Sequence, residues 1–346
     1  MSFFGLDVGT SNLVSAYELG GKILYKKVRD AFYVINLDKG IGINPLQAAG
    51  VSYLEQDGKI FLLGDDAVRF AAGQNQQARR PMKNGLISDI DLEAEGMMIK
   101  LLSAVTSNIP EGSIVKFSIP AKQLGADDSP LVIHSEIIQD ILQTLGFKGS
   151  PINEAACVVL SELAELKFTG LAISAGGGLI NSTICNLGQP LSDFTFSIQG
   201  SGDKIDQIVA NSLRGLGVST TSITLAKERM SKEKRGIYNP AGRNSKEQRI
   251  EKGIASAYKS IIDNFVDNLE MVFATSHNIP NFEDKLAFVV AGGTALMPGF
   301  CDYLNEAMAR KKFPIEIDQA HLASEPLDCV AKGALIAARL TNGQSI

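Results

Sequence analysis

The sequence predicts an α/β fold in which one strand–turn–strand unit occurs twice. Two stretches, 3–16 and 171–185, each read as an apolar arm, a glycine-containing turn and a second apolar arm. A third stretch, 287–299, reads as a buried strand that runs into two adjacent glycines and then into a helix. Because the first two turns lie nearly half a chain apart, the three together predict a duplicated domain that closes on one nucleotide.

The first turn has the chemistry of a phosphate-binding loop. Gly9 leaves room for backbone N–H groups to approach a phosphate, and Thr10, Ser11 and Asn12 add hydroxyl and amide donors. Asp7, at the end of the first arm, is placed to hold a metal-bound water. The alternative, from these residues alone, is an ordinary hairpin with a polar tip.

Five motifs, in the right order, resemble those of one superfamily. They are Asp7–Thr10 and Ile173–Gly178 as the two phosphate loops, Val290–Gly299 as the adenosine motif, and Ile152–Ala156 and Pro326–Ala334 as the two connecting helices. The chain resembles the actin, Hsp70 and sugar-kinase superfamily over nearly its whole length, and within it the bacterial actin homologues related to MreB. This resemblance implies an actin-like α/β fold with two duplicated domains of mixed sheet, flanked by helices, around a nucleotide cleft.

The resemblance also implies a division of the 346 residues into two domains, in keeping with the chain length. Domain IA is expected to comprise residues 1–29, 70–150 and 326–346, with a small subdomain IB at 30–69. Domain IIA is expected at 151–190 and 253–325, with subdomain IIB at 191–252.

The matched motifs imply a set of site residues for ATP or ADP and Mg²⁺. Asp7 would act in catalysis by orienting the water shell of the metal, and Glu154 would orient the water that attacks the γ-phosphate. The alternative for Glu154 is a carboxylate that only stabilises a helix N-terminus. The nucleotide-binding set comprises Gly9, Thr10, Ser11, Asn12, Ser174, Gly176, Gly177, Gly178, Gly202, Asp203, Lys227, Glu228, Gly292, Gly293 and Thr294. Within it, Lys227 and Glu228 would serve the adenine and ribose.

The second phosphate loop departs from the family pattern at Ser174. Most members have Asp there, which helps to hold metal-bound waters, and a second acidic or polar position after the loop reads Asn181. A hydroxyl cannot replace a carboxylate charge near a divalent cation. Hydrolysis is therefore expected to be slower, or the metal to depend more on Asp7, while backbone N–H groups of the glycine turn still bind phosphate.

Composition excludes several other classes of protein. A net charge of −5 argues against a dedicated nucleic-acid binder. The sequence contains no apolar run of the roughly 18–20 residues that span a bilayer, and neither a signal peptide nor an amphipathic membrane-binding helix before the first strand is expected. The cysteines lack zinc or redox spacing and are expected to be buried free thiols in a reducing cytoplasm; they are Cys157, Cys185, Cys301 and Cys329. The isolated histidines, His134, His277 and His321, are not expected to be ligands.

Spacing predicts further elements that the structure can test. Residues 50–54 and 59–63 are expected to pair through a turn at Asp57-Gly58, after an irregular stretch at 40–45. Helices are expected over 92–105, with Leu92 on the buried face, over 134–145, over most of 150–166, over 223–234 and over 250–273. The charged run 232–252 is expected to be a solvated loop. The loop 79–89 resembles a loop of MreB-like proteins, and this resemblance implies that it lies near the mouth of the cleft and serves structure more than chemistry.

The favoured function is that of an actin-like ATPase in the cytoplasm that polymerises into cytoskeletal filaments, with other copies of itself and an adaptor protein as partners. A second hypothesis is a nucleotide-binding scaffold that hardly hydrolyses ATP, and Ser174 motivates it. A third is a small-molecule kinase, because fold does not fix function. No acceptor-site carboxylate motif supports the kinase.

Overall fold

The computed structural model describes residues 2–36, 46, 48, 50–51, 53–56, 58–74 and 76–343. Its first sheet has the strand order β10-β9-β1-β2-β3. The strands are β1 (Phe3–Val8), β2 (Asn12–Leu19), β3 (Lys22–Arg29), β9 (Ile114–Ile119) and β10 (Lys148–Asn153). β1, β2 and β3 are antiparallel neighbours, whereas β9 is parallel to β1 and β10 is parallel to β9.

The second sheet repeats this plan. Its strands are β11 (Gly170–Ala175), β12 (Leu179–Asn186), β13 (Gln189–Pro190), β14 (Phe196–Gln199), β15 (Leu286–Ala291) and β16 (Ile317–Leu322). β11 and β12 form an antiparallel hairpin, β15 is parallel to β11, and β16 is parallel to β15. Every residue of β11 is buried, as expected for a central strand with both faces covered. The predicted duplication is therefore confirmed as two mixed sheets, each with a hairpin extended by parallel strands.

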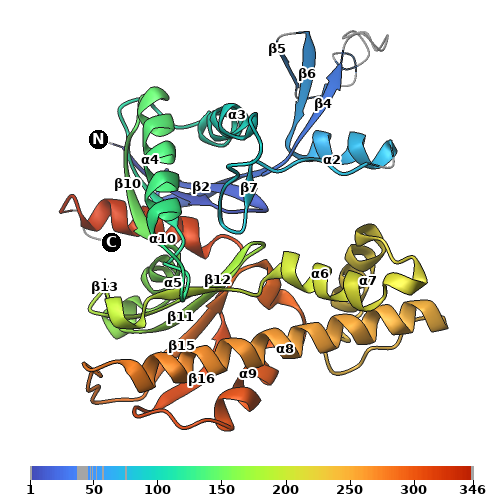
Figure 1. The fold of residues 1–346 in the computed structure, drawn as a ribbon. Helices are drawn as coiled ribbons and strands as arrows, with labels where there is room; N and C mark the ends of the chain where they lie inside the picture. The colour runs from blue at the N-terminus through green and yellow to red at the C-terminus, as the bar shows by residue number, and fades with distance from the viewer. Residues whose placement is uncertain are drawn as a thin grey trace.

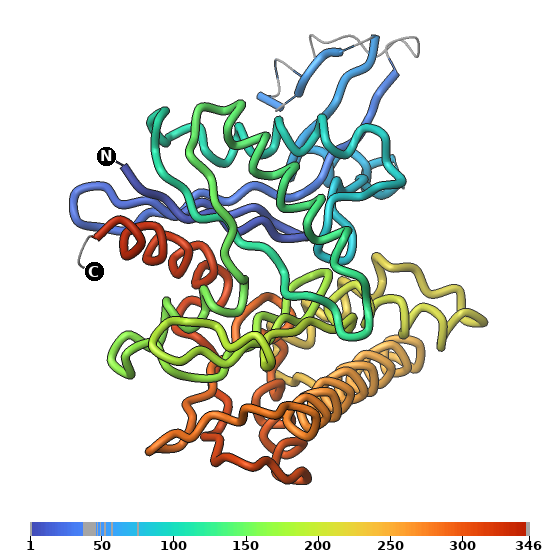
Figure 2. Tube along the Cα trace, turned by 60° about the vertical axis from the view of Figure 1, so that its left-hand side comes forward, coloured from blue at the N-terminus to red at the C-terminus, as the bar shows by residue number. Residues whose placement is uncertain are grey.

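Helices cover both sheets (Figure 1). They are α2 (Gly64–Gly73), α3 (Ala94–Thr106), α4 (Ser129–Thr144), α5 (Glu154–Glu162), α6 (Gly202–Ser212), α7 (Thr220–Lys232), α8 (Ser245–Thr275), α9 (Phe300–Ala309) and α10 (Cys329–Leu340). α3 and α4 pack on the first sheet, and the long helix α8 packs along the second. Figure 2 shows both chain ends on the same side of the molecule.

A small antiparallel sheet and α2 extend beyond the first sheet at the upper right of Figure 1. It consists of β4 (Phe32–Asn36), β5 (Tyr53–Gln56) and β6 (Lys59–Leu63). The predicted pairing of 50–54 with 59–63 is confirmed from Tyr53 onward. Asp57 and the stretch 40–45 lie outside the described residues. A two-stranded hairpin of β7 (Met82–Lys83) and β8 (Leu86–Ile87) follows.

Helix α10 lies against both α5 and β1 at backbone contact distance. A Cβ atom added to Gly333 of α10 would lie 1.8 Å from the carbonyl oxygen of Cys157 in α5. A Cβ atom added to Gly5 of β1 would lie 2.0 Å from the carbonyl oxygen of Ala331 in α10. Small residues thus let the two connecting helices cross at backbone contact distance.

Some predicted element boundaries were wrong. Residues 148–153 form strand β10, and α5 starts only at Glu154, because the Asn153 side chain accepts a hydrogen bond from the Ala156 N–H and caps the helix there. α4 starts at Ser129, before the predicted 134, and α7 starts at Thr220, before the predicted 223. α3 starts at Ala94, and Leu92 precedes it with its side chain almost fully exposed, 99%.

The charged run 232–252 is only partly a loop, because α8 starts at Ser245, where Asn244 caps it. Within this run Glu251 is fully buried. Its carboxylate accepts hydrogen bonds from the Arg229 Nη2 at 2.8 Å and the Arg235 Nη2 at 2.9 Å. A buried carboxylate is tolerated when it is paired and hydrogen-bonded in this way. The mixed positive and negative residues of the run 232–252 thus form an internal network of ion pairs as well as a solvated surface.

The prediction that the cysteines are buried free thiols is confirmed for Cys157, Cys185 and Cys329. Cys301 is also free, but it is only half-buried. Within the described residues, no helix has both the length and the apolar character that crossing a bilayer requires.

We expect Gly333→Ala to lower the free energy of unfolding by about 1–3 kcal/mol or more, because the added methyl group meets the α5 backbone, which cannot move aside without displacing the helix. Gly96→Ala is the matched control, because Gly96 lies in α3 with open space around it and an alanine there favours the helix. Thermal unfolding of both variants checks this. Equal melting temperatures for the two would contradict the close crossing.

Candidate functional site

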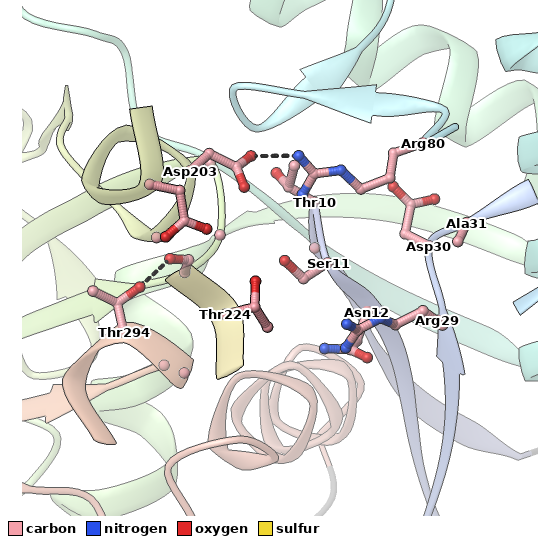
Figure 3. A pocket seen from close by; sticks show the side chains of 18 of the residues that line it. Thr10, Ser11, Asn12, Arg29, Asp30, Ala31, Arg80, Asp203, Thr224 and Thr294 are labelled. Atoms are coloured by element: carbon pink, nitrogen blue, oxygen red, sulfur yellow. Dashed lines mark hydrogen bonds and ion pairs between the residues drawn. The ribbon is translucent and has the colours of Figure 1, made fainter. Parts of the chain in front are cut away.

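A cavity of about 960 Å³ lies between the two sheets, with walls from both. Every residue that the sequence motifs assigned to the site lines it, from Asp7 and Glu154 to Gly292, Gly293 and Thr294. Figure 3 shows Thr10 and Ser11 on one wall, with Asp203, Thr224 and Thr294 facing them from the other. The fold therefore gathers segments that are more than 280 residues apart in the chain, since Asp7 and Gly292 share this cavity.

The two glycine turns meet at the centre of this cavity. A Cβ atom on Gly177 would lie 2.2 Å from the Ser11 hydroxyl oxygen, and one on Gly178 would lie 2.5 Å from the Gly85 nitrogen. Only glycine permits the turn after β11 to approach the turn after β1 so closely. Thr10 contributes to this contact, because its hydroxyl accepts a hydrogen bond from the Gly85 N–H at 3.1 Å.

The glycine turn after β15 and the start of α6 both donate hydrogen bonds to the glycine turn after β11. The Thr294 hydroxyl donates to the carbonyl oxygen of Gly176 at 2.6 Å, and the Asp203 N–H donates to that of Gly177 at 3.0 Å. Gly292, with φ of +95°, permits the turn after β15, because a Cβ atom there would lie 2.3 Å from the Ala175 carbonyl oxygen. A short 3-10 segment, Gly293–Leu296, follows before α9.

Two half-buried carboxyl groups, Asp7 and Glu154, lie at the inner end of the site. Burial raises the pKa of Asp7, against a hydrogen bond from the Ser118 hydroxyl at 2.9 Å. Burial also raises the pKa of Glu154, and the nearby charge of Asp7 raises it further. Both side chains therefore lie in a region of strongly negative potential when they are ionised.

Ser174 and Asn181 hold the Glu154 carboxyl group from its two sides. They are register partners on β11 and β12, and both are buried. The Ser174 hydroxyl donates to Oε1 of Glu154 at 2.6 Å, and the Asn181 amide donates to Oε2 at 2.8 Å. A carboxylate at position 174 would repel Glu154 at this distance, whereas the serine hydroxyl donates a hydrogen bond to it.

The outer wall carries the residues expected to serve adenine and ribose. Lys227 is already paired with Asp206 of α6, with 2.6 Å between Nζ and Oδ1. Glu228 is more exposed, and its nearest cation is Lys232, one helical turn away at 3.8 Å. Both residues line the cavity, with Lys227 held in place by its ion pair.

Sequence reasoning missed the charged residues at the opening of the cavity. Arg80 reaches across from the first-sheet side, and its Nη2 lies 2.7 Å from Oδ2 of Asp203 (Figure 3). Asp30 lies buried beneath it, and burial raises the pKa of Asp30 to about 8. The sequence signal for Arg80 was the loop 79–89, which was expected to serve structure; Asp30 carried no signal, because nothing local shows that it is buried.

The residues present fit a Mg²⁺ site of the kind that uses few protein ligands. No group of three or more His, Cys, Asp or Glu side chains suited to a metal occurs in the part of the chain that the structure describes. Mg²⁺ commonly takes one or two carboxylates and completes its shell with waters and phosphate oxygens. Asp7 can supply such a carboxylate, and a cation would offset the cost of ionising two half-buried acids.

We expect Glu154→Gln to stabilise the nucleotide-free protein by on the order of 1–3 kcal/mol near neutral pH. Because the pKa of Glu154 lies above its ordinary 4.5 in the folded state, the unfolded chain loses this proton first, and wild-type stability falls as pH rises from there. Glutamine does not ionise, so the gain grows with pH. Thermal unfolding in EDTA between about pH 5 and pH 8 measures it.

Glu162→Gln is the control for this stabilisation, because Glu162 lies in the same helix. Although burial acts to raise its pKa, hydrogen bonds from Ser324 and Ser161 lower it, so its replacement is expected to destabilise. A Glu154→Gln gain that stays constant with pH would show that ionisation of this carboxyl group is not disfavoured by the fold.

The fold matches those of solved bacterial actin homologues. The structure titled MamK double helical filament has a TM-score of 0.70 at 15% sequence identity, with 99% of each chain covered. MreB5 of Spiroplasma citri has a TM-score of 0.64 at 17% identity in its ADP-bound structure, with 99% of this chain and 98% of that chain covered. Its AMPPNP-bound structure gives 0.66 at 16%, with the same coverage. At these identities the likeness shows the fold alone, and it confirms the actin-like architecture.

No curated protein matches the sequence. The Volactin family matches residues 1–338, which is nearly the whole chain. Because this family model matches nearly the whole chain, and the chain has two mixed sheets in an actin-like fold, the chain belongs to the Volactin family.

Proposed function

We propose that this protein is an actin-like ATPase that binds ATP or ADP with Mg²⁺ in the cavity between its sheets and assembles with further copies of itself into filaments. The observation that carries the proposal is the convergence of three glycine turns and two half-buried acids on one cavity. The domain division expected from the sequence belongs to this proposal, with the cavity as the cleft between domains I and II.

Phosphate groups fit the centre of the cavity, where the turns after β1 and β11 face each other. The missing side chains of Gly176 and Gly177 let backbone groups come close to a ligand, and Ser11 adds a hydroxyl donor. Gly293 and Thr294 with the Lys227 region of α7 would flank the nucleoside. MreB5 of Spiroplasma citri, solved with ADP and with AMPPNP, supports a nucleotide in this fold.

Hydrolysis would depend on positioning and electrostatics, because phosphoryl transfer needs little covalent help from the protein. Glu154 lines the cavity with both carboxylate oxygens already held, so its remaining lone pairs can orient a water molecule. Asp7 would hold Mg²⁺ through its water shell, and the ion would supply charge neutralisation at the β- and γ-phosphates. Ser174 adds no charge, so Asp7 alone would provide the carboxylate for the metal.

A filament is the assembly that the comparisons favour, since one structure of this fold is titled MamK double helical filament. The alternative of a scaffold that hardly hydrolyses ATP rests on Ser174, which leaves one carboxylate fewer near the metal than the family pattern has. The ATPase and the scaffold differ only in the rate of ATP hydrolysis, so measurements on one protein preparation can distinguish these two hypotheses.

Sedimentation at high speed tests the proposal. We expect purified protein to pellet with Mg²⁺-ATP and to stay in the supernatant without nucleotide, and negative-stain images of the pellet to show filaments. Asp7→Asn is the control, because it keeps the size and the Ser118 contact of Asp7 while it removes the charge for Mg²⁺. Protein that stays in the supernatant under all nucleotide, salt and concentration conditions would contradict the filament.

Phosphate release from the same samples decides between the two forms of the proposal. Release above background together with assembly supports the ATPase, and assembly with background release supports the scaffold.

We also expect Arg80→Ala and Asp203→Asn each to speed release of a bound fluorescent nucleotide by roughly 2- to 5-fold, as the loss of one partly exposed ion pair allows. The Arg80–Asp203 pair joins the two walls at the opening, so its loss lets the walls separate more often. Stopped-flow displacement measures the rate. Arg69→Ala, in an exposed pair confined to α2, is the control and should leave the rate unchanged.

A further inference from the structure

Asn181 makes contact with three separate parts of the molecule. It lies on β12 of the second sheet, its amide nitrogen donates to Glu154 at the start of α5, and its Oδ1 accepts the N–H of Ala121 at 2.8 Å. Ala121 follows β9 of the first sheet by two residues. The side chain is buried, with 1% of its surface exposed, so no solvent competes for these bonds.

The direction of these hydrogen bonds is fixed. The backbone N–H of Ala121 can only donate, so the atom that faces it must be the amide oxygen of Asn181. The NH₂ group is therefore turned toward Glu154, and Oε2 must accept from it. The Asn181 amide cannot be flipped without placing two donors against each other. Ala121 thus determines which group Asn181 offers to Glu154.

We propose that Asn181 is a positioning residue for ATP hydrolysis, an inference that rests on the function proposed above. Asn181 holds the Glu154 carboxylate from one side. It also couples the orientation of this carboxylate to the docking of residues 120–124 against the second sheet. Asn181 itself acts on the attacking water only through Glu154. Ser174, on the opposite side of the carboxylate, belongs to the second sheet alone. Of the two donors to Glu154, Asn181 is the one that also accepts a hydrogen bond from Ala121, which follows β9 of the first sheet.

The contact of residues 120–124 with the second sheet also offers a matched control for substitutions at Asn181. Ser197 of β14 is the register partner of Asn181, it is equally buried, and its hydroxyl donates to the carbonyl oxygen of the same residue, Ala121, at 2.8 Å. The backbone of Ser197 also pairs with Lys122 and Leu124. Ser197→Ala therefore removes a side-chain link between the same two segments but leaves the donors to Glu154 in place.

The experiment measures steady-state phosphate release and ATP affinity for wild type, Asn181→Ala, Asn181→Asp and Ser197→Ala, each normalised to the amount of pelleted protein. Asn181→Asp keeps the size and the acceptor for Ala121 but replaces the donor to Glu154 with a carboxylate that repels it, so it displaces Glu154 in a second way and tests the idea even if the alanine variant does not fold. We expect both Asn181 variants to lose roughly 10- to 100-fold in kcat, because a misplaced Glu154 no longer orients water. ATP affinity should change by less than about 3-fold, since the Asn181 side chain bonds Glu154 and Ala121 and not the glycines of the phosphate-binding turns.

The outcomes separate this inference from the function on which it rests. Wild type that assembles but releases no phosphate would overturn the ATPase and, with it, the positioning role. An active wild type with unchanged kcat in Asn181→Asp overturns the positioning role alone. An equal loss in Ser197→Ala also overturns it, because the effect would then belong to docking of 120–124. Loss of kcat in the Asn181 variants, with Ser197→Ala close to wild type, supports it.

Discussion

The approach of α10 to α5 and β1 is the contact on which the rest of the structure depends. Two glycines, Gly333 and Gly5, remove the side chains that would keep the backbones apart, so one helix packs on an element of each half. Because β1 and β11 each end in a glycine turn, this packing brings the two turns into contact at Gly177 and Gly178. The geometry of the cavity at these two turns therefore follows from helix packing at some distance from it.

The electrostatics of the site follow from the same burial. The surrounding turns partly bury Asp7 and Glu154, which raises the pKa of both and makes a cation favourable between the sheets. Ser174 fits this setting, because its hydroxyl donates to Glu154 where a third carboxylate would add repulsion. The departure from the family pattern therefore has a physical role in holding Glu154, and it shifts the demand for a metal ligand onto Asp7.

The two walls of the cavity are joined at several depths. Arg80 and Asp203 pair at the opening, Gly85 and Thr10 meet the second turn at the centre, and Ala121 is bonded to Asn181 at the inner end. These links differ in burial: the outer pair is about one-third exposed, while Asn181 is fully enclosed. The link at the opening is thus the one that solvent screens most, whereas solvent does not compete for the contacts of Asn181.

The repeated hairpins, the glycine turns and the order of the motifs could be predicted from the chain alone, because these depend on local spacing and on residues that permit close backbone approach. Each site residue that the motifs named lines the cavity, although they left out others that line it, such as Asp30 and Arg80. Only the tertiary structure decided that Leu92 is exposed and Glu251 buried, since burial depends on segments distant in sequence. For the same reason the pairing of Arg80 with Asp203, and the bond that fixes the Asn181 amide against Ala121, could not be read from the chain: each joins residues far apart in sequence, and no local pattern encodes their distance.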